Sequence, residues 1–308
     1  MRRLTAGPDG GNTSRARPPR GASALASGSR LGGEVATLRV TPYSEVTRFD
    51  LARTLGGRGR YWTTCYLVDG LLIDSGCAHT APELERALAG KPFDRIVNTH
   101  SHEDHIGANG RLQRRRDVDV LAHADALPVL AEPRRQRLHA YRRVFWGYPE
   151  PSKGRALADG DEIRTPRFRF IALHTPGHAP DHLCLFEPDR GWLFSGDLYI
   201  GGRDRALREE YDIWGILESL RRVAALPVRT LFPGSARIPP DPRAALDAKV
   251  AYYRQMGERV LRLRAEGLGV RAIAREVCGP PMAMEWMTGF NFSRRGLVES
   301  YLRCAPGR

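Results

Sequence analysis

Six consecutive residues in the first half of the chain carry most of its potential chemistry. His100, His102, Asp104 and His105 are four side chains able to bind a metal within six positions. Imidazole and carboxylate groups suit zinc, iron and manganese. A polar turn in which Asp104 caps the next helix would explain one such residue, but not four. The segment is therefore interpreted as a metal-ligand loop, with His100 and His102 facing one direction and Asp104 and His105 another.

Three further motifs occur before and after this loop. An apolar stretch ends in Asp74-Ser-Gly76, and two downstream segments read Thr175-Pro-Gly-His178 and Phe194-Ser-Gly-Asp197. Together with the His-x-His-x-Asp-His pattern, which follows a short predicted strand, they resemble the motifs of the metallo-beta-lactamase superfamily. Each motif alone is weak, but the four occur in the family's order across residues 65–235. The ordered set is highly specific.

The resemblance implies a site for one or two metal ions, zinc or alternatively iron or manganese. It assigns His100, His102 and His178 to the first ion, Asp104 and His105 to the second, and Asp197 to a bridge between them. Two dications lower the pKa of a bound water toward neutrality, which generates a hydroxide nucleophile, and Asp104 is expected to orient it. Asp74 has two open interpretations, as a residue that holds the ligand loop and as a turn residue.

The last motif departs from the family's pattern. Leu231-Phe-Pro-Gly234-Ser235 resembles a Pro-Gly-His motif in which serine replaces the histidine. No histidine follows His182, so no nearby downstream residue can substitute. Ser235 is a candidate second-site position, but it offers only a hydroxyl or a place for a water. A mononuclear site therefore remains open, as do a supporting and a purely structural role for His182.

A mixed set of strands and helices must position these motifs. Residues 36–76 read as strands, with a hairpin turn at Asp69-Gly70. Strand and helix patterns then alternate as far as residue 240, which predicts sheets covered by helices. The expected fold class is α+β. The resemblance implies the αββα sandwich of the superfamily, two mixed sheets packed face to face with helices outside.

The chain is expected to have three parts. Residues 1–34 are rich in small and turn-forming residues without apolar periodicity, so disorder is predicted. Residues 35–240 form the predicted catalytic domain. Residues 241–308 follow a proline-rich break and resemble the helical or winged-helix extension of a lactamase-like group that includes an endoribonuclease. Such an extension either packs on the catalytic domain, which is the favoured interpretation, or binds nucleic acid.

Residues 124–149 form a predicted helical insert in the catalytic domain. Between Arg134 and Tyr148 it mixes five arginines with four aromatic residues. One interpretation is a substrate-binding lid, in which arginine meets a carboxylate or phosphate. The other is an amphipathic surface helix whose aromatic side chains belong to the core. The sequence does not favour either.

Composition limits the class of protein. No apolar run approaches the roughly 20 residues that cross a bilayer, and the first 35 residues lack the apolar core of a secretory signal. Five scattered cysteines without C-x-x-C spacing favour a reducing cytoplasm. The net charge of +13 comes mainly from arginine and makes nucleic acid a candidate partner beside a small-molecule substrate.

The predicted function is hydrolysis of an ester, thioester or related acyl bond by a metal-bound hydroxide. Phosphodiester cleavage, as by an endoribonuclease, is the first alternative, although the chain is short for the large insertion of dedicated nucleases. A mononuclear iron sulfur dioxygenase is the second, because such relatives resemble the same motif set. A scaffold or nucleic-acid-binding protein with a degenerate site is the third, and the intact ligands at the other positions argue against it.

Overall fold

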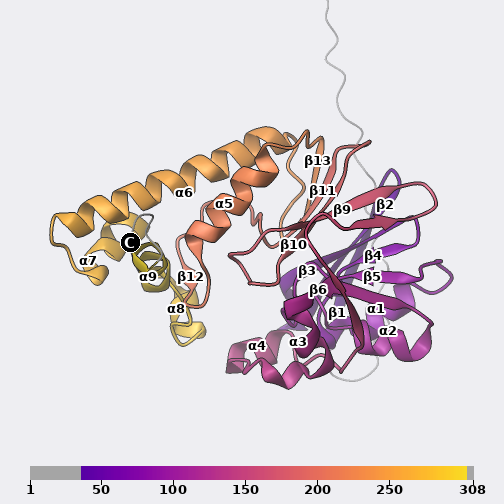
Figure 1. The fold of residues 1–308 in the computed structure, drawn as a ribbon. Helices are drawn as coiled ribbons and strands as arrows, with labels where there is room; N and C mark the ends of the chain where they lie inside the picture. Colours follow the sequence, from indigo (N-terminus) through magenta and orange to yellow (C-terminus); the bar gives the residue numbers. More distant parts are fainter. Residues whose placement is uncertain (1–35, 304–308) are drawn as a thin grey trace, which may run out of the picture.

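The computed structural model describes residues 36–303 and contains two large β-sheets (Figure 1). The first sheet is formed by the N-terminal part of these residues. The disorder predicted for residues 1–34 lies outside the described residues. The strands follow the chain in spatial order: β1 (Ala36–Tyr43), β2 (Val46–Leu55), β3 (Arg58–Val68), β4 (Leu71–Ile73), β5 (Arg95–Val97), β6 (Asp119–His123) and β7 (Gly154–Leu157). Pairing is antiparallel from β1 to β4 and parallel from β4 to β7.

The second sheet has five strands in the order β13-β11-β10-β9-β8. Their bounds are β8 (Glu162–Arg164), β9 (Arg169–His174), β10 (Leu183–Glu187), β11 (Trp192–Gly196) and β13 (Thr230–Pro233). Only β11 and β13 pair in parallel. A separate two-stranded sheet joins β12 (Leu207–Arg208) to β14 (Phe292–Ser293), so a segment of the catalytic region pairs with one near the C-terminus.

Aromatic and branched side chains fill the space between the two large sheets. Tyr66 from the first sheet and Phe170, Phe194 and Phe232 from the second belong to one buried cluster. The rings of Phe194 and Phe232 stack with centroids 4.7 Å apart. This interior fixes the two sheets face to face.

Helices cover the outer face of each sheet, as predicted. α1 (Ala81–Ala87), α2 (Asn109–Arg115) and α3 (Leu127–Ala131) share a buried cluster with the first sheet. α5 (Ile213–Ala224), α6 (Pro242–Ala265), α7 (Val270–Cys278) and α9 (Arg294–Arg303) share another with the second. The architecture is therefore the expected αββα sandwich. None of the helices between residues 36 and 303 is both long and apolar enough to span a lipid bilayer.

The C-terminal extension is helical and shares its core with the second sheet. α6 is the long helix at the top of Figure 1; it packs against α5 and α9. Its buried Lys249 donates hydrogen bonds to the carbonyls of Ile200 and Gly202 and to the carboxylate of Asp204. This helix therefore anchors the loop that follows β11, near the predicted site.

The insert at residues 124–149 is less helical than predicted. It contains α3 and α4 (Ala140–Phe145), each short and separated by turns. Pro128 and Pro133 occupy the first turns of helical segments and Pro149 follows α4, and proline limits how far a helix extends. Helix α4 of the insert lies close to the segment that follows α8 (Ala283–Met287), because Tyr141 on α4 donates a hydrogen bond to Asn291.

Candidate metal centre

The predicted site residues follow the ends of strands from both sheets. Asp74 follows β4, the segment 100–105 follows β5, His178 follows β9, and Asp197 and Ser235 follow β11 and β13. Several of these strand ends meet at one edge of the sandwich, so residues far apart in sequence come together. We call residues 100–105 the ligand loop.

Three histidines form the first group of converging ligand atoms. One ring nitrogen each of His100, His102 and His178 lies within 4.8 Å of the other two. Nδ1 of His102 is 2.9 Å from Nε2 of His100 and 3.0 Å from Nε2 of His178. Burial, with the neighbouring imidazoles, lowers the pKa of all three histidines well below the ordinary value. Neutral imidazoles directed at one point are suited to a borderline dication.

A second group joins His100, His105 and Asp197, again with ligand atoms within 4.8 Å. Nε2 of His105 is 3.6 Å from Oδ2 of Asp197, and it is buried without a hydrogen-bond partner in residues 36–303. Burial opposes the charged form of His105, but Asp74 and Asp197 outweigh it and raise its pKa well above the usual range. The carboxylates that attract a proton here would also attract a cation.

Asp104 lies outside both groups, although it is a neighbour of His105 in the ligand loop. Its carboxyl is buried, and burial raises the pKa of Asp104 to about 6 against the opposing effect of His105. The described residues thus bring His100, His102, His105, His178 and Asp197 together in two groups. The placement of Asp104 on the second ion stays a prediction.

Asp74 holds the ligand loop, which favours one of its two interpretations. Its Oδ1 accepts a hydrogen bond from the backbone N–H of Thr99 at 2.7 Å, and its Oδ2 accepts from the Thr99 hydroxyl at 2.8 Å. Nδ1 of His105 is also 2.8 Å from Oδ2 of Asp74. A carboxylate only accepts, so it orients the His105 ring with Nε2 toward the site.

Ser235 contacts Asp197 and belongs to neither ligand group. Its hydroxyl donates to Oδ1 of Asp197 at 3.0 Å, while Oδ2 of Asp197 faces His105. The preceding Gly234 is required here, because a Cβ on it would lie 2.9 Å from both Asp197 and His105. Ser235 therefore orients the carboxylate.

The turn that presents His178 is shaped by a glycine. Gly177 has a φ of 130°, and a Cβ there would lie 2.2 Å from the backbone nitrogen of Ile216 at the start of α5. Only glycine permits this approach. His182, at the end of the same turn, is buried behind the site: Nδ1 is 2.9 Å from the Thr175 hydroxyl and Nε2 has no partner within residues 36–303. Burial lowers the pKa of His182 to about 3.

The remaining histidines lie elsewhere. His123 and His174 stack on each other with ring centroids 4.3 Å apart, and His79 lies 3.1 Å from the backbone carbonyl of Arg143. Neither they nor His139 belongs to a ligand group in the described part of the chain. None of these histidines belongs to a ligand motif in the sequence, and the geometry agrees.

A buried ion pair links the insert to the ligand loop. Glu103 is 1% exposed and accepts two hydrogen bonds from Arg142 on α4, one of them at 2.7 Å from Nε. Arg142 is thus neither a lid arginine awaiting substrate nor a surface residue, the two interpretations that the sequence left open. Its partner was not recognised in the sequence, where Glu103 is only a spacer between candidate ligands.

Tyr211 and Arg208 border the site and carry no motif. The Tyr211 ring is 4.4 Å from the His178 ring, and its hydroxyl is 3.4 Å from Nε2 of His178. The guanidinium of Arg208 lies 5.5 Å from the Tyr211 ring and 5.9 Å from the Trp146 ring. We call Arg142, Trp146, Arg208 and Tyr211 the wall of the site.

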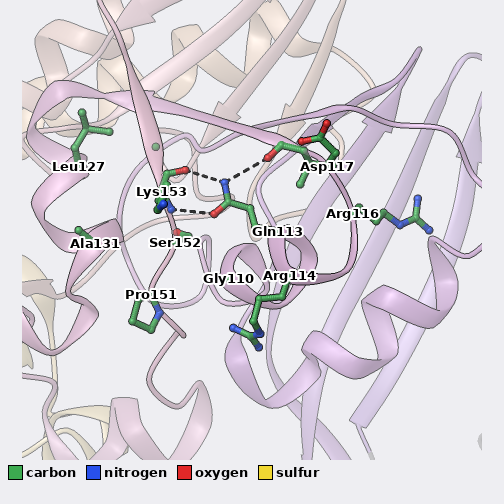
Figure 2. A pocket seen from close by; sticks show the side chains of 12 residues that line it. Gly110, Gln113, Arg114, Arg116, Asp117, Leu127, Ala131, Pro151, Ser152 and Lys153 are labelled. Atoms are coloured by element: carbon green, nitrogen blue, oxygen red, sulfur yellow. Dashed lines mark hydrogen bonds between the residues drawn. The ribbon is translucent and has the colours of Figure 1, made fainter.

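A small cavity of about 30 Å³ lies against His178, Asp197 and Tyr211. This volume fits water-sized groups, so it suits the reacting atoms rather than a whole substrate. A larger cavity of about 790 Å³ lies elsewhere and has no candidate ligand in its lining (Figure 2). There the Gln113 side chain is held by the backbone of Lys153, with hydrogen bonds of 2.8 and 2.9 Å.

Known proteins resemble this chain over the same region. An atrochrysone carboxyl ACP thioesterase from Aspergillus fumigatus is 27% identical over 222 residues, covering 68% of this chain and 62% of the relative. A hydroxyacylglutathione hydrolase from Bdellovibrio bacteriovorus is 30% identical over 161 residues, covering 52% and 55%. The chain thus spans little more than half the length of these curated relatives.

Solved structures share the fold. A metallo-beta-lactamase family protein from Thermus thermophilus has a TM-score of 0.60 at 21% identity, with 87% of this chain and 93% of the other covered. The sequence profile of the metallo-beta-lactamase superfamily matches residues 59–235, which include every candidate ligand. With four motifs in order, an αββα sandwich and two converging ligand groups, the chain belongs to the metallo-beta-lactamase superfamily.

Proposed function

We propose that this protein is a metal-dependent hydrolase of a thioester or related acyl ester. The observation that carries the proposal is the convergence of His100, His102 and His178 on one point, with His105 and Asp197 beside them. In the proposed assignment the three histidines hold one ion, His105 and Asp197 contribute to a second position, and Asp104 completes it. Zinc suits this set of nitrogen and oxygen donors best, with iron or manganese as alternatives.

When bound at such sites, divalent cations lower the pKa of a coordinated water and polarise the carbonyl under attack. The protein supplies the arrangement. Asp74 and Thr99 fix the start of the ligand loop, Ser235 orients Asp197, and Tyr211 covers the outer side of His178. Asp104, buried next to His105, is the proposed acceptor and orienting group for the attacking water.

Three observations support an acyl substrate over a phosphodiester. Relatives covering more than half of this chain are named thioesterases and hydroxyacylglutathione hydrolases. The C-terminal extension packs on the second sheet through a shared core, so the helices that could have met nucleic acid bury their apolar faces in the protein itself. Many arginines are also paired with acidic neighbours, as in Arg243–Asp247 and Arg295–Glu299.

The test combines metal analysis with a substrate panel. Purified protein is assayed for zinc, iron and manganese, then for hydrolysis of thioesters, lactones, lactams and phosphodiesters and for oxidation of persulfides. We expect zinc as the main metal and thioesters as the best substrates. Phosphodiester cleavage with no thioester turnover would refute the acyl assignment, and one tightly held iron with persulfide oxidation would assign the protein to the dioxygenases.

A further inference from the structure

Arg208 has an unusual position for an arginine. It is the last residue of the short strand β12 and is 8% exposed. Within residues 36–303 its guanidinium has no hydrogen bond or ion pair, and its Nη1 is buried without a partner. Arginine stays charged in proteins, and burying an unpaired charge is strongly unfavourable. Such a group is suited to bind an anion supplied by a ligand.

The surroundings of Arg208 provide a second donor. Trp146 lies over the guanidinium at 5.9 Å, is 8% exposed, and its Nε1 is also a buried donor without a partner. Two carboxylates act on Arg208 through their charge, but neither bonds to it: Glu103 is held by Arg142, and Asp104 is assigned to the proposed metal centre. Two unused donors in one buried region are complementary to the oxygens of a carboxylate or phosphate.

Arg208 also lies close to the reaction centre. The centroid of the Tyr211 ring lies 5.5 Å from its guanidinium carbon and 4.4 Å from the centroid of the His178 ring. The unpaired guanidinium and a ligand of the proposed metal centre therefore lie next to the same aromatic ring.

We propose that Arg208 binds an anionic group of the substrate, a carboxylate or phosphate, and that Trp146 donates a second hydrogen bond to it. This inference rests on the proposed function, because it assigns the anion to the acyl or the thiol part of a thioester. Arg208 is then a specificity-determining residue. The histidines hold the metal that acts on the acyl bond, and Arg208 determines which acyl compounds bind with that bond at the metal.

The first arm of the test does not depend on turnover. Wild-type protein with its metal is titrated in a calorimeter with glutarate and with inorganic phosphate, beside R208Q, R208K and a matched control, R203Q, which removes an exposed arginine five positions earlier. All four proteins keep the same metal ligands, so anion binding by the metal is common to them. We expect R208Q to weaken binding of at least one anion about tenfold, as loss of a charge-assisted hydrogen bond implies, with R208K intermediate and R203Q unchanged.

The same arm can overturn the inference. It is wrong if wild-type protein binds neither anion, or if R208Q binds both as tightly as wild type. Folding is checked by melting temperature. Because the guanidinium makes no bond within residues 36–303, R208Q should melt at or above the wild-type temperature, whereas a residue kept for structure would lower it.

The second arm identifies the source of the anion. The acyl side is tested with glutaryl and pentanoyl thioesters of N-acetylcysteamine, and the thiol side with pentanoyl thioesters of 4′-phosphopantetheine and pantetheine. We expect R208Q to raise KM for the charged member of one pair about tenfold and to leave its neutral partner nearly unchanged. An equal loss on all four substrates would refute the role. If wild type hydrolyses none of them, the proposed function fails, while calorimetry still decides whether Arg208 binds anions.

Discussion

The ligand loop and the wall of the site lie next to each other, but their polar side chains differ in how many hydrogen-bond partners the protein provides. In the ligand loop, supporting contacts come from the protein: Asp74 orients His105, and Asp181 accepts the backbone N–H of Ser101 at 2.8 Å. In the wall, Arg208 and Trp146 keep buried donors without partners in residues 36–303. The ligand loop is thus held in place by the protein and leaves free the ligand nitrogen Nε2 of His105, whereas the free groups of the wall are hydrogen-bond donors suited to an anion.

This contrast implies that mutations in the two regions affect different properties of the enzyme. Changes in the ligand loop and its supports should alter metal content and slow every substrate alike. Changes at the wall's free donors should leave metal content intact and alter the preference among substrates.

Replacing His178 should have the largest effect. His178→Ala removes one of three imidazoles from the first group, so we expect both a clear loss of bound metal and a fall in kcat/KM on the order of a thousandfold or more for all substrates. Elemental analysis and steady-state kinetics measure the two quantities. His123→Ala, which changes a histidine outside the site, is the control, and full activity in His178→Ala would reject the ligand assignment.

Much of this first region could be predicted from sequence, because it is made of local motifs. The loop from His100 to His105, His178 and Asp197 each follow a recognisable strand end. Alternating strand and helix patterns predicted sheets covered by helices, and the family resemblance implied the αββα sandwich. The strands β7 and β8 were missed, since each has only three or four residues and little apolar periodicity.

The wall could not be predicted in the same way. Arg208 is one arginine among many in a chain of net charge +13, and only its lack of partners distinguishes it. That property depends on residues brought from the insert, from β12 and from the C-terminal extension. The hydrogen bonds of Glu103 and Ser235 could likewise not be predicted from the sequence, because their partners Arg142 and Asp197 are distant along the chain.

The Glu103–Arg142 pair joins the ligand loop to the wall. Breaking this pair should have the next largest effect, on the stability of the fold. Arg142→Met leaves a buried carboxylate beside the ligands, so we expect a loss of about 3–5 kcal/mol in the free energy of unfolding. Urea denaturation provides the measurement. Arg143→Met changes the exposed neighbouring arginine and should be nearly neutral. If both variants were equally stable, the insert would not be anchored through this pair.

Asp74→Asn should weaken the metal centre without removing a ligand. The amide keeps the shape of the side chain but no longer fixes His105 as a carboxylate does. We expect metal affinity to fall about 10- to 100-fold with little change in KM for any substrate. Competition with a chelator measures the affinity. A change in substrate preference with normal metal content would contradict the proposed difference between the two regions.

Ser235→His should have the smallest effect and the opposite sign. An imidazole is a better ligand for a borderline dication than a hydroxyl, so occupancy of the second position should rise, by about tenfold in affinity. Equilibrium dialysis with zinc tests this. The control Ser235→Ala removes only the bond to Asp197 and should lower occupancy slightly. Two tightly held ions in wild type would show that serine does not limit the second position.

The pairing of β12 with β14 has a consequence for synthesis on the ribosome. Every residue of the two ligand groups has been made once Asp197 is added, but the strand that carries Arg208 acquires its partner only when Phe292 and Ser293 emerge. Such distant pairings form late, because the intervening chain must first be ordered. The nascent chain thus contains every residue of the two ligand groups long before the strand of Arg208 can find its partner. The proposed anion site at Arg208 is therefore completed after the proposed metal ligands have all been made.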